Sequence, residues 1–447
     1  MADAPVLAAA DRLQAATPLF LLGPDDPLPE GGEGPARMMR FAGELDQVCA
    51  FAGGVLVGAG DGSEPLALGA ASMKLGAGDY RIARLPDGFD ERSAALGFAL
   101  GAYRFSRYRD DEAPPVLIVD EASLAVATCR EADSIAFGRD LINTPAEDMG
   151  PDAVEEVALD LGRTFGAEVT VHRGDGFAEA FPLIHAVGRA AAIAPRLVEL
   201  TWSGGDRFNL ALVGKGVCFD SGGLNLKPGK SMALMKKDMG GAATALALAR
   251  RVMEEGLPIN LRLLVPTVEN AISGNSFRPG DVFRARDGQT VEISNTDAEG
   301  RLILADALAL AAEARPNRIV TLATLTGAAR VALGPDLPPI YSTEPGFADR
   351  VLEAGGRLAD PLWPMPFWQR YESYLRSDIA DVNHAADTPF AGSITAALFL
   401  KRFAQGLPFT HIDTFAWVPT ARPGRPKGGD VLALRALFAA LAEEFSD

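Results

Sequence analysis

The chain has 447 residues, of which 48% are hydrophobic and 23% are charged. This composition is typical of a packed globular protein, and it excludes a wholly disordered or collagen-like chain. The formal net charge of −17 argues against nucleic acid and anionic membranes as partners, because both repel an acidic surface.

The amino terminus lacks the pattern of a secretory signal, since it carries Asp3 and Asp11 and no basic segment. No apolar run approaches the roughly 18 residues that span a bilayer. The three cysteines are too few and too scattered for a disulfide framework. We therefore expect a cytoplasmic protein with no membrane partner.

The first third of the chain mixes short strand and helix patterns with turn-rich segments. We expect loops at Gly23–Pro35 and Asp110–Pro115, a strand at Gly54–Gly58, and helices at Glu91–Arg104 and Glu121–Leu141. Proline at position 145 ends the last helix, because the residue before a proline disfavours helical backbone. This pattern predicts a smaller α/β domain over residues 1–135.

After about residue 150, strands and helices alternate regularly. Strands are predicted at Glu168–His172, Leu197–Trp202, Leu210–Val213, Leu261–Val265, Ile319–Leu325 and Thr410–Phe415. Helices are predicted at Ala153–Phe165, Gly241–Glu255, Glu299–Arg315, Ile394–Gln405 and Val431–Phe445. The alternation indicates an α/β sheet covered on both faces, forming a second domain over residues 136–447. Within it, the nearly continuous apolar run Leu302–Ala312 predicts a deeply buried helix.

Acidic residues of the second domain gather beside glycines where strands give way to helices. The segments are Val213–Gly223 with Lys215 and Asp220, Met235–Gly241 with Asp238, and Asn295–Leu302 with Asp297 and Glu299. Open α/β sheets place their sites at these transitions. Taken singly, each acid is better explained as a helix cap or as a helix-start acid facing the dipole.

Taken together, the four acids predict a cation site. Four carboxylates at one sheet edge repel one another unless cations neutralise them, and two divalent ions supply the matching charge. An oxygen-rich ligand set without cysteine or histidine suits magnesium, manganese or zinc.

The three acidic segments resemble the leucyl aminopeptidase (cytosolic aminopeptidase) family of two-metal exopeptidases. Asn295–Leu302 reads NTDAEGRL, which is that family's signature in complete form. The likeness extends over about residues 139–447 and includes Arg139–Pro145, Thr321–Gly327 and Gly392–Leu400. It implies a smaller N-terminal α/β domain, a larger catalytic domain with a mixed central sheet flanked by helices, and a homohexamer.

The resemblance also implies the metal ligands. A tight site would be formed by Lys215, Asp220, Asp238 and Glu299, and an exchangeable site by Asp220, Asp297 and Glu299. A lysine ligand must be neutral, and burial beside two cations lowers its pKa in that direction. Manganese or zinc is expected in these sites, with magnesium as a third candidate.

The implied reaction releases N-terminal amino acids from peptides, with a hydroxide that bridges the two metals as nucleophile. Lys227 would polarise the scissile carbonyl, and Arg301, at a helix start, would hold bicarbonate as general base. Substrate-binding residues are expected at Met235, Asn295, Thr324, Leu325, Gly327 and Phe415. The segment Thr414–Trp417 stands where the family has Ile-Ala-Gly, so either Phe415 or Trp417 is expected to narrow the side-chain pocket, which leaves a preference for leucine open.

Two other functions fit parts of the pattern. A two-metal phosphoesterase uses a similar carboxylate cluster, but the lysine ligand and the signature match the peptidase. A non-catalytic hexameric scaffold or nucleic-acid-binding regulator is disfavoured by the negative charge and by the intact ligand set.

Overall fold

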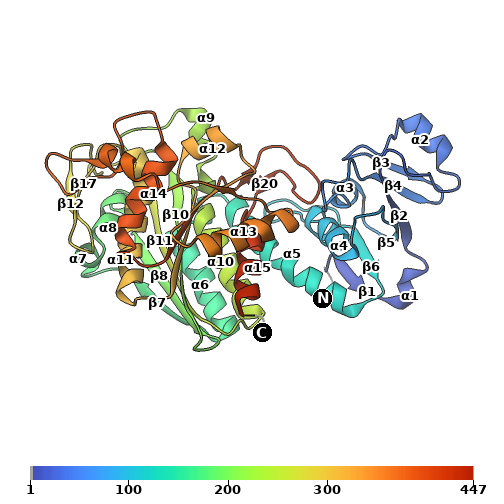
Figure 1. Ribbon diagram of the computed structural model, residues 1–447, viewed down its shortest axis with the longest axis horizontal. Helices are drawn as coiled ribbons and strands as arrows, with labels where there is room; N and C mark the ends of the chain where they lie inside the picture. The colour runs from blue at the N-terminus through green and yellow to red at the C-terminus, as the bar shows by residue number, and fades with distance from the viewer. Residues whose placement is uncertain (1–3, 446–447) are drawn as a thin grey trace. The chain divides into compact units, whose positions relative to one another are not determined.

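The computed structural model describes residues 4–445, which divide into two compact units. Among these residues, one unit comprises those up to Phe137 with Val418–Gly428, and the other comprises Gly138–Trp417 with those from Gly429 onward. Figure 1 shows a mixture of helices and strands in each unit. Among the described residues, no helix is both long enough and apolar enough to cross a membrane.

The first unit contains a six-stranded sheet in the order β1-β6-β5-β2-β4-β3. Its strands are β1 (Val6–Ala8), β2 (Thr17–Leu22), β3 (Val48–Phe51), β4 (Gly54–Gly58), β5 (Asp79–Arg84) and β6 (Val116–Val119). Its helices are α1 (Ala10–Leu13), α2 (Glu33–Met39), α3 (Gly69–Lys74), α4 (Glu91–Gly101) and the first part of α5 (Ala122–Asn143). All pairings are parallel except β3 with β4, which form a hairpin.

One predicted loop of this unit is wrong at its end. Helix α2 begins at Glu33, inside the segment Gly23–Pro35 that we expected to be loop. Pro35 does not prevent the helix, because it lies in the first turn, where backbone N–H groups have no intrahelical partner to lose.

The second unit is built on a nine-stranded mixed sheet. Its strands are β7 (Glu168–His172), β8 (Arg196–Ser203), β9 (Asn209–Gly214), β10 (Gly216–Asp220), β11 (Asn260–Asn270), β14 (Arg318–Ala323), β15 (Pro339–Ser342), β16 (Trp363–Pro364) and β18 (Phe409–Asp413). A small separate sheet contains β12 (Val282–Arg284), β13 (Thr290–Glu292) and β17 (Val382–Asn383), and β19 (Trp417–Val418) pairs with β20 (Gly428–Gly429). The central strands β11, β9, β14 and β18 run parallel, whereas β8 is antiparallel to β11 and β7, and β15 is antiparallel to β18.

Helices cover both faces of this sheet. They are α6 (Pro151–Phe165), α7 (Phe177–Ala180), α8 (Pro182–Gly188), α9 (Gly229–Met232), α10 (Gly240–Glu254), α11 (Glu299–Glu313), α12 (Gly327–Leu333), α13 (Pro345–Arg357), α14 (Gly392–Phe403) and α15 (Leu434–Phe445), with the 3₁₀ helices η1 (Met235–Met239), η2 (Thr296–Ala298) and η3 (Gln369–Leu375). Helices α6, α10 and α15 pack on one side of the central strands, and α8, α11 and α14 on the other (Figure 1). The expected mixed sheet flanked by helices is therefore confirmed.

Helix α11 confirms the prediction of a deeply buried helix, because every residue from Glu299 to Ala312 is buried. The acid in the middle of this helix, Asp306, caps a neighbouring helix. The Asp306 carboxylate accepts hydrogen bonds from the backbone N–H groups of Leu183 at 2.8 Å, Ile184 at 3.2 Å and Arg286 at 2.9 Å. Leu183 and Ile184 lie in the first turn of α8, which has no local side-chain cap. Asp306 thus caps one helix from the middle of another.

We expect Asp306→Ala to destabilise the chain by about 3 kcal/mol or more, because each buried N–H left without an acceptor costs about 1–3 kcal/mol. The measurement is the shift of the thermal unfolding midpoint. Asp349→Ala, which removes an exposed acid of α13, is the matched control. Equal midpoints for the two variants would show that the cap contributes little.

The carboxyl ends of the central parallel strands meet at one edge of the sheet, where the acidic segments follow them. Gly214 at the end of β9 is opposite Leu322 of β14, and Ala323 is opposite Asp413 of β18. Lys215 is fixed there by its backbone, since its N–H donates to Leu322 O at 2.9 Å. The sheet thus places Lys215 and the residues that follow it at a single edge.

The predicted strand Thr410–Phe415 is too long by two residues, because β18 ends at Asp413. The Asp413 carboxylate accepts the N–H groups of Leu325 at 2.9 Å and Thr326 at 3.1 Å, which belong to the loop after β14. Ala416 then adopts a left-handed backbone with φ of +54°, which no strand can include. The chain therefore turns at Thr414 and Phe415.

Candidate active site

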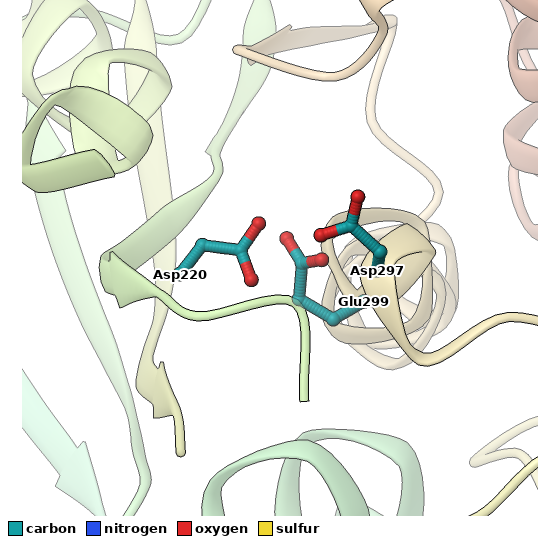
Figure 2. Close-up of side chains that lie close together, drawn as sticks. All are labelled: Asp220, Asp297 and Glu299. Atoms are coloured by element: carbon teal, nitrogen blue, oxygen red, sulfur yellow. The ribbon is translucent and has the colours of Figure 1, made fainter. Parts of the chain in front are cut away.

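Three acids converge at the sheet edge. Asp220 ends β10, Asp297 lies in η2, and Glu299 is the first residue of α11. Figure 2 shows their side chains pointing toward one another, and one carboxylate oxygen from each lies within 4.8 Å of the other two. Asp220 and Glu299 are buried, and Asp297 is partly exposed. The geometry thus brings together three of the acids that the sequence selected.

The fourth acid joins the cluster through Lys215. The Lys215 ammonium lies 2.8 Å from Asp238 Oδ2 and 2.9 Å from Glu299 Oε1, and it donates to the Thr324 carbonyl at 2.8 Å. Burial opposes the charged form, but the negative charges of Asp238 and Glu299 outweigh it and raise the pKa of Lys215. Glycine is required at position 300, because a Cβ there would lie 2.4 Å from Lys215 Cε.

The central acids resist ionisation in the absence of cations. Burial and the charge of Asp238 raise the pKa of Asp220, while burial and the charge of Asp220 raise that of Glu299. Asp220 Oδ1 accepts hydrogen bonds from the N–H of Gly222 and from Asn270 Nδ2, each at 2.8 Å. Glu299 Oε2 is buried and accepts no hydrogen bond within the described chain. A carboxylate oxygen in that state is suited to a cation.

Lys227 holds the other side of the cluster. Its ammonium lies 2.8 Å from Asp220 Oδ2 and 2.5 Å from Asp297 Oδ1. Lys215 and Lys227 therefore each bridge two acids, in the way that a bound cation would. The cluster therefore fits divalent metal ions. It offers several carboxylate oxygens as ligands, one of them buried without a partner, and two ammonium groups already occupy positions between pairs of acids.

Arg301 lies in the first turn of α11 behind the acids. Its Nη1 donates to the His384 carbonyl at 2.8 Å, whereas its buried Nε has no acceptor in the described part of the chain. Burial lowers the pKa of Arg301 to about 10, so the guanidinium stays charged at neutral pH. A charged, unpartnered N–H at the start of a long helix is suited to an anion such as bicarbonate.

His384 supports this corner, and sequence reasoning missed it because it has no ligand spacing. Its Nε2 lies 2.8 Å from the Asn295 carbonyl, and its Nδ1 accepts the N–H of Ser294 at 3.3 Å. Burial lowers the pKa of His384 to about 3, so the ring is neutral and Nε2 carries the proton that it donates. His384 thus ties the turn that carries Asn295 to Arg301.

A cavity of about 390 Å³ opens beside the cluster. Five of the expected substrate-binding residues line it, namely Met235, Thr324, Leu325, Gly327 and Phe415. So do five of the expected metal and catalytic residues, namely Lys215, Asp220, Lys227, Asp238 and Asp297. Asn295, Glu299 and Arg301 lie outside the lining. The Asn295 side chain accepts the N–H of Asp297 at 2.9 Å, so that it shapes the turn of an acid in the cluster.

Three further cations line the cavity, which sequence reasoning did not select: Lys230, Lys237 and Arg330. Lys237 precedes Asp238 in η1 and is only 5% exposed. Burial lowers the pKa of Lys237 to about 8, which leaves the ammonium as the main form at pH 7. In the sequence, Lys237 is simply one of two adjacent lysines.

Comparison with known proteins identifies the family of the chain. The catalytic-domain model of the cytosol aminopeptidase family matches residues 136–438, and a model of the M17 aminopeptidase N-terminal domain matches residues 40–118. A protein of Syntrophotalea carbinolica named "Probable cytosol aminopeptidase" is 40% identical over 78% of this chain and 74% of its own length.

Two solved structures extend the comparison. The crystal structure of cytosol aminopeptidase from Coxiella burnetii superimposes with a TM-score of 0.91 at 40% identity and covers 99% of both chains. The bottromycin maturation enzyme BotP in complex with manganese gives a TM-score of 0.88 at 32% identity, covering 97% of this chain and 100% of BotP. The chain therefore belongs to the cytosol aminopeptidase family.

Proposed function

We propose that this chain releases N-terminal amino acids from peptides by metal-dependent hydrolysis at the acid–lysine cluster. Family membership makes the chain a peptidase, and hence a hydrolase. The observation that carries the proposal is the convergence of Asp220, Asp297 and Glu299 within 4.8 Å, beside the cavity that Lys227 lines. All of these residues lie in the region 136–447, which we propose as the catalytic domain, with 1–135 as a separate N-terminal domain.

The proposed cofactors are two divalent ions per chain, of manganese or zinc, with magnesium as a third candidate. The proposed ligands are Lys215, Asp220, Asp238 and Glu299 for the tight site, and Asp220, Asp297 and Glu299 for the exchangeable site. Two such ions, when bound, make water nucleophilic near neutral pH and take up the free α-amine of the substrate. Lys215 must lose its proton to act as a ligand, so metal binding releases a proton.

Lys227 is proposed to polarise the scissile carbonyl. It lines the cavity, and its side chain is only 14% exposed, so its charge acts in a poorly hydrated setting. Once its acid partners hold cations, the ammonium is left to stabilise the negative charge that develops on the carbonyl oxygen. This role requires Lys227 to stay protonated. Burial lowers the pKa of Lys227, but the negative charges of Asp220 and Glu299 outweigh burial and raise that pKa overall.

Arg301 is proposed to hold bicarbonate through its unpartnered Nε at the start of α11. Bicarbonate, when bound, supplies a general base toward the attacking water. The hydrogen bond from Arg301 to the His384 carbonyl orients the guanidinium for this task.

The substrate side chain is proposed to occupy the cavity between Met235, Thr324, Leu325, Gly327 and Phe415, with Asn295 acting through the turn that it shapes. We expect Phe415→Ala to raise kcat/KM for leucyl- and phenylalanyl-anilides relative to alanyl-anilide by about tenfold or more, because a few methylene volumes discriminate by 10–200-fold. Phe390→Ala, which removes an exposed ring outside the cavity, is the control. If the kcat/KM ratios are unchanged in Phe415→Ala, Phe415 does not line the substrate side-chain pocket.

Two experiments address the rest of the proposal. Hydrolysis of an aminoacyl-anilide and of a phosphate ester, each with and without chelator, separates the aminopeptidase from a two-metal phosphoesterase and from a non-catalytic scaffold or nucleic-acid-binding regulator. Only an aminopeptidase of this kind cleaves the anilide, and chelator abolishes that cleavage. We also propose a cytoplasmic homohexamer, in keeping with the family resemblance, and analytical ultracentrifugation tests the assembly directly.

A further inference from the structure

One wall of the cavity carries cations that form no ion pair with any carboxylate of the described residues. The acids that line the cavity are Asp220, Asp238 and Asp297, and their ion-pair partners are Lys215 and Lys227. The remaining lining cations are Lys230, Lys237 and Arg330, and none forms an ion pair with any residue between 4 and 445. A chain with a net charge of −17 therefore presents a locally basic pocket wall.

Lys237 is the most constrained of these cations. It is 5% exposed, and its Nζ lies 4.5 Å from the centroid of the Phe415 ring. Among the described residues, its ammonium forms no hydrogen bond or ion pair, and the Phe415 ring is its cation–π partner. The Arg330 guanidinium lies 5.2 Å from the same centroid, so two positive groups flank one aromatic side chain of the pocket. Cation–π contact only partly replaces the hydration that a buried ammonium loses.

The backbone fixes this basic wall relative to the reacting centre. Lys237 lies in η1 between Met235, which also lines the cavity, and Asp238, which the Lys215 ammonium contacts at 2.8 Å. An anion bound in the cavity near Phe415 would therefore lie a short distance from the acid cluster. Such an anion would form a charge-assisted hydrogen bond with the Lys237 ammonium and would give this buried cation a partner.

We propose that the cavity selects peptides whose N-terminal residue is acidic, with Lys237 and Arg330 binding the side-chain carboxylate of aspartate or glutamate. This inference rests on the proposed aminopeptidase function and on the placement of the substrate side chain beside Phe415. Acidic side chains are also slim, so they suit a pocket that an aromatic ring narrows.

The test compares glutamyl-, glutaminyl- and leucyl-anilides. The anilide group removes the terminal carboxylate from all three substrates, so glutamyl-anilide alone carries a carboxylate, on its side chain. In the wild type, kcat/KM for glutamyl-anilide should exceed that for glutaminyl-anilide by about tenfold or more, because a desolvated charge pair is worth at least that factor. Lys237→Met should lower this ratio by about tenfold or more, and Lys237→Arg should retain a larger share of it. Lys236→Met removes the neighbouring lysine, which does not line the cavity, and should leave the ratio unchanged.

The ratio is compared within each variant, so a general loss of activity cancels. If Lys237→Met does not fold, Arg330→Gln at an exposed position gives the same test, with a smaller expected fall. A wild-type ratio at or below one, or a ratio that neither variant changes, overturns the inference. It is also overturned if Lys237→Met instead alters the preference for a leucyl-glycine dipeptide over its C-terminal amide, since the cation would then bind the peptide's own terminus. Failure of the proposed function looks different, because no anilide would then be cleaved with metal present.

Discussion

Lys227→Ala and Arg301→Ala are each expected to lower kcat by about 10² or more while leaving the metal content of the chain unchanged. Loss of a group that stabilises developing charge, or of a positioned general base, has effects of this size. Neither residue is a proposed ligand, and the Lys227 ammonium, although it contacts Asp220 Oδ2 and Asp297 Oδ1, is expected to leave both carboxylates free for metal once it is removed. The measurement pairs turnover of alanyl-anilide with metal analysis of the same samples.

The two roles can be separated. If Arg301 holds bicarbonate, added bicarbonate should stimulate the wild type and Lys227→Ala but not Arg301→Ala. Lys236→Ala is the matched control for loss of a lysine next to the site, and it should keep wild-type turnover. Wild-type turnover in both Lys227→Ala and Arg301→Ala would contradict the assigned roles.

Lys215→Arg is expected to lose bound metal and to lower activity as severely as Lys215→Ala. A guanidinium stays protonated and has no lone pair to give to a cation, although it keeps the positive charge. The site is also too tight for a larger group, since Lys215 is buried and passes over Gly300. Metal analysis and alanyl-anilide turnover at saturating metal measure the two effects.

Metal affinity is expected to depend on pH. Without metal, the pKa values of Lys215, Asp220 and Glu299 are all raised, so protons compete with cations for these groups. Metal affinity should therefore fall as the pH is lowered. Lys230→Arg changes an exposed lysine of the cavity and should leave affinity unaltered. A metal-replete, active Lys215→Arg enzyme would show that Lys215 is only a neighbouring charge.

The sequence predicts those parts of the fold that depend on local pattern. Helix α11 and strand β9 are predicted from their continuous apolar runs, because elements buried on all sides contain few polar residues. The acids of the candidate site are found for another reason, since each lies in a short segment beside glycines that allow close approach.

Other features depend on contacts between distant segments, and the sequence does not predict them. The end of β18 at Asp413 depends on the loop at Leu325 and Thr326, about ninety positions away in the chain. His384 acts through backbone groups of Asn295 and Ser294, which no spacing pattern encodes. Burial of Lys237 beneath Phe415 is likewise a tertiary property.

Metal titration of chelator-treated protein tests the central claim most directly. The chain is freed of metal, and manganese or zinc is added back while bound metal per chain and alanyl-anilide hydrolysis are both followed. We expect no hydrolysis without metal, recovery that is complete at two ions per chain, and ready loss of one ion on dialysis, because both proposed sites share the acids Asp220 and Glu299. Full activity in chelator with no bound metal would contradict this expectation.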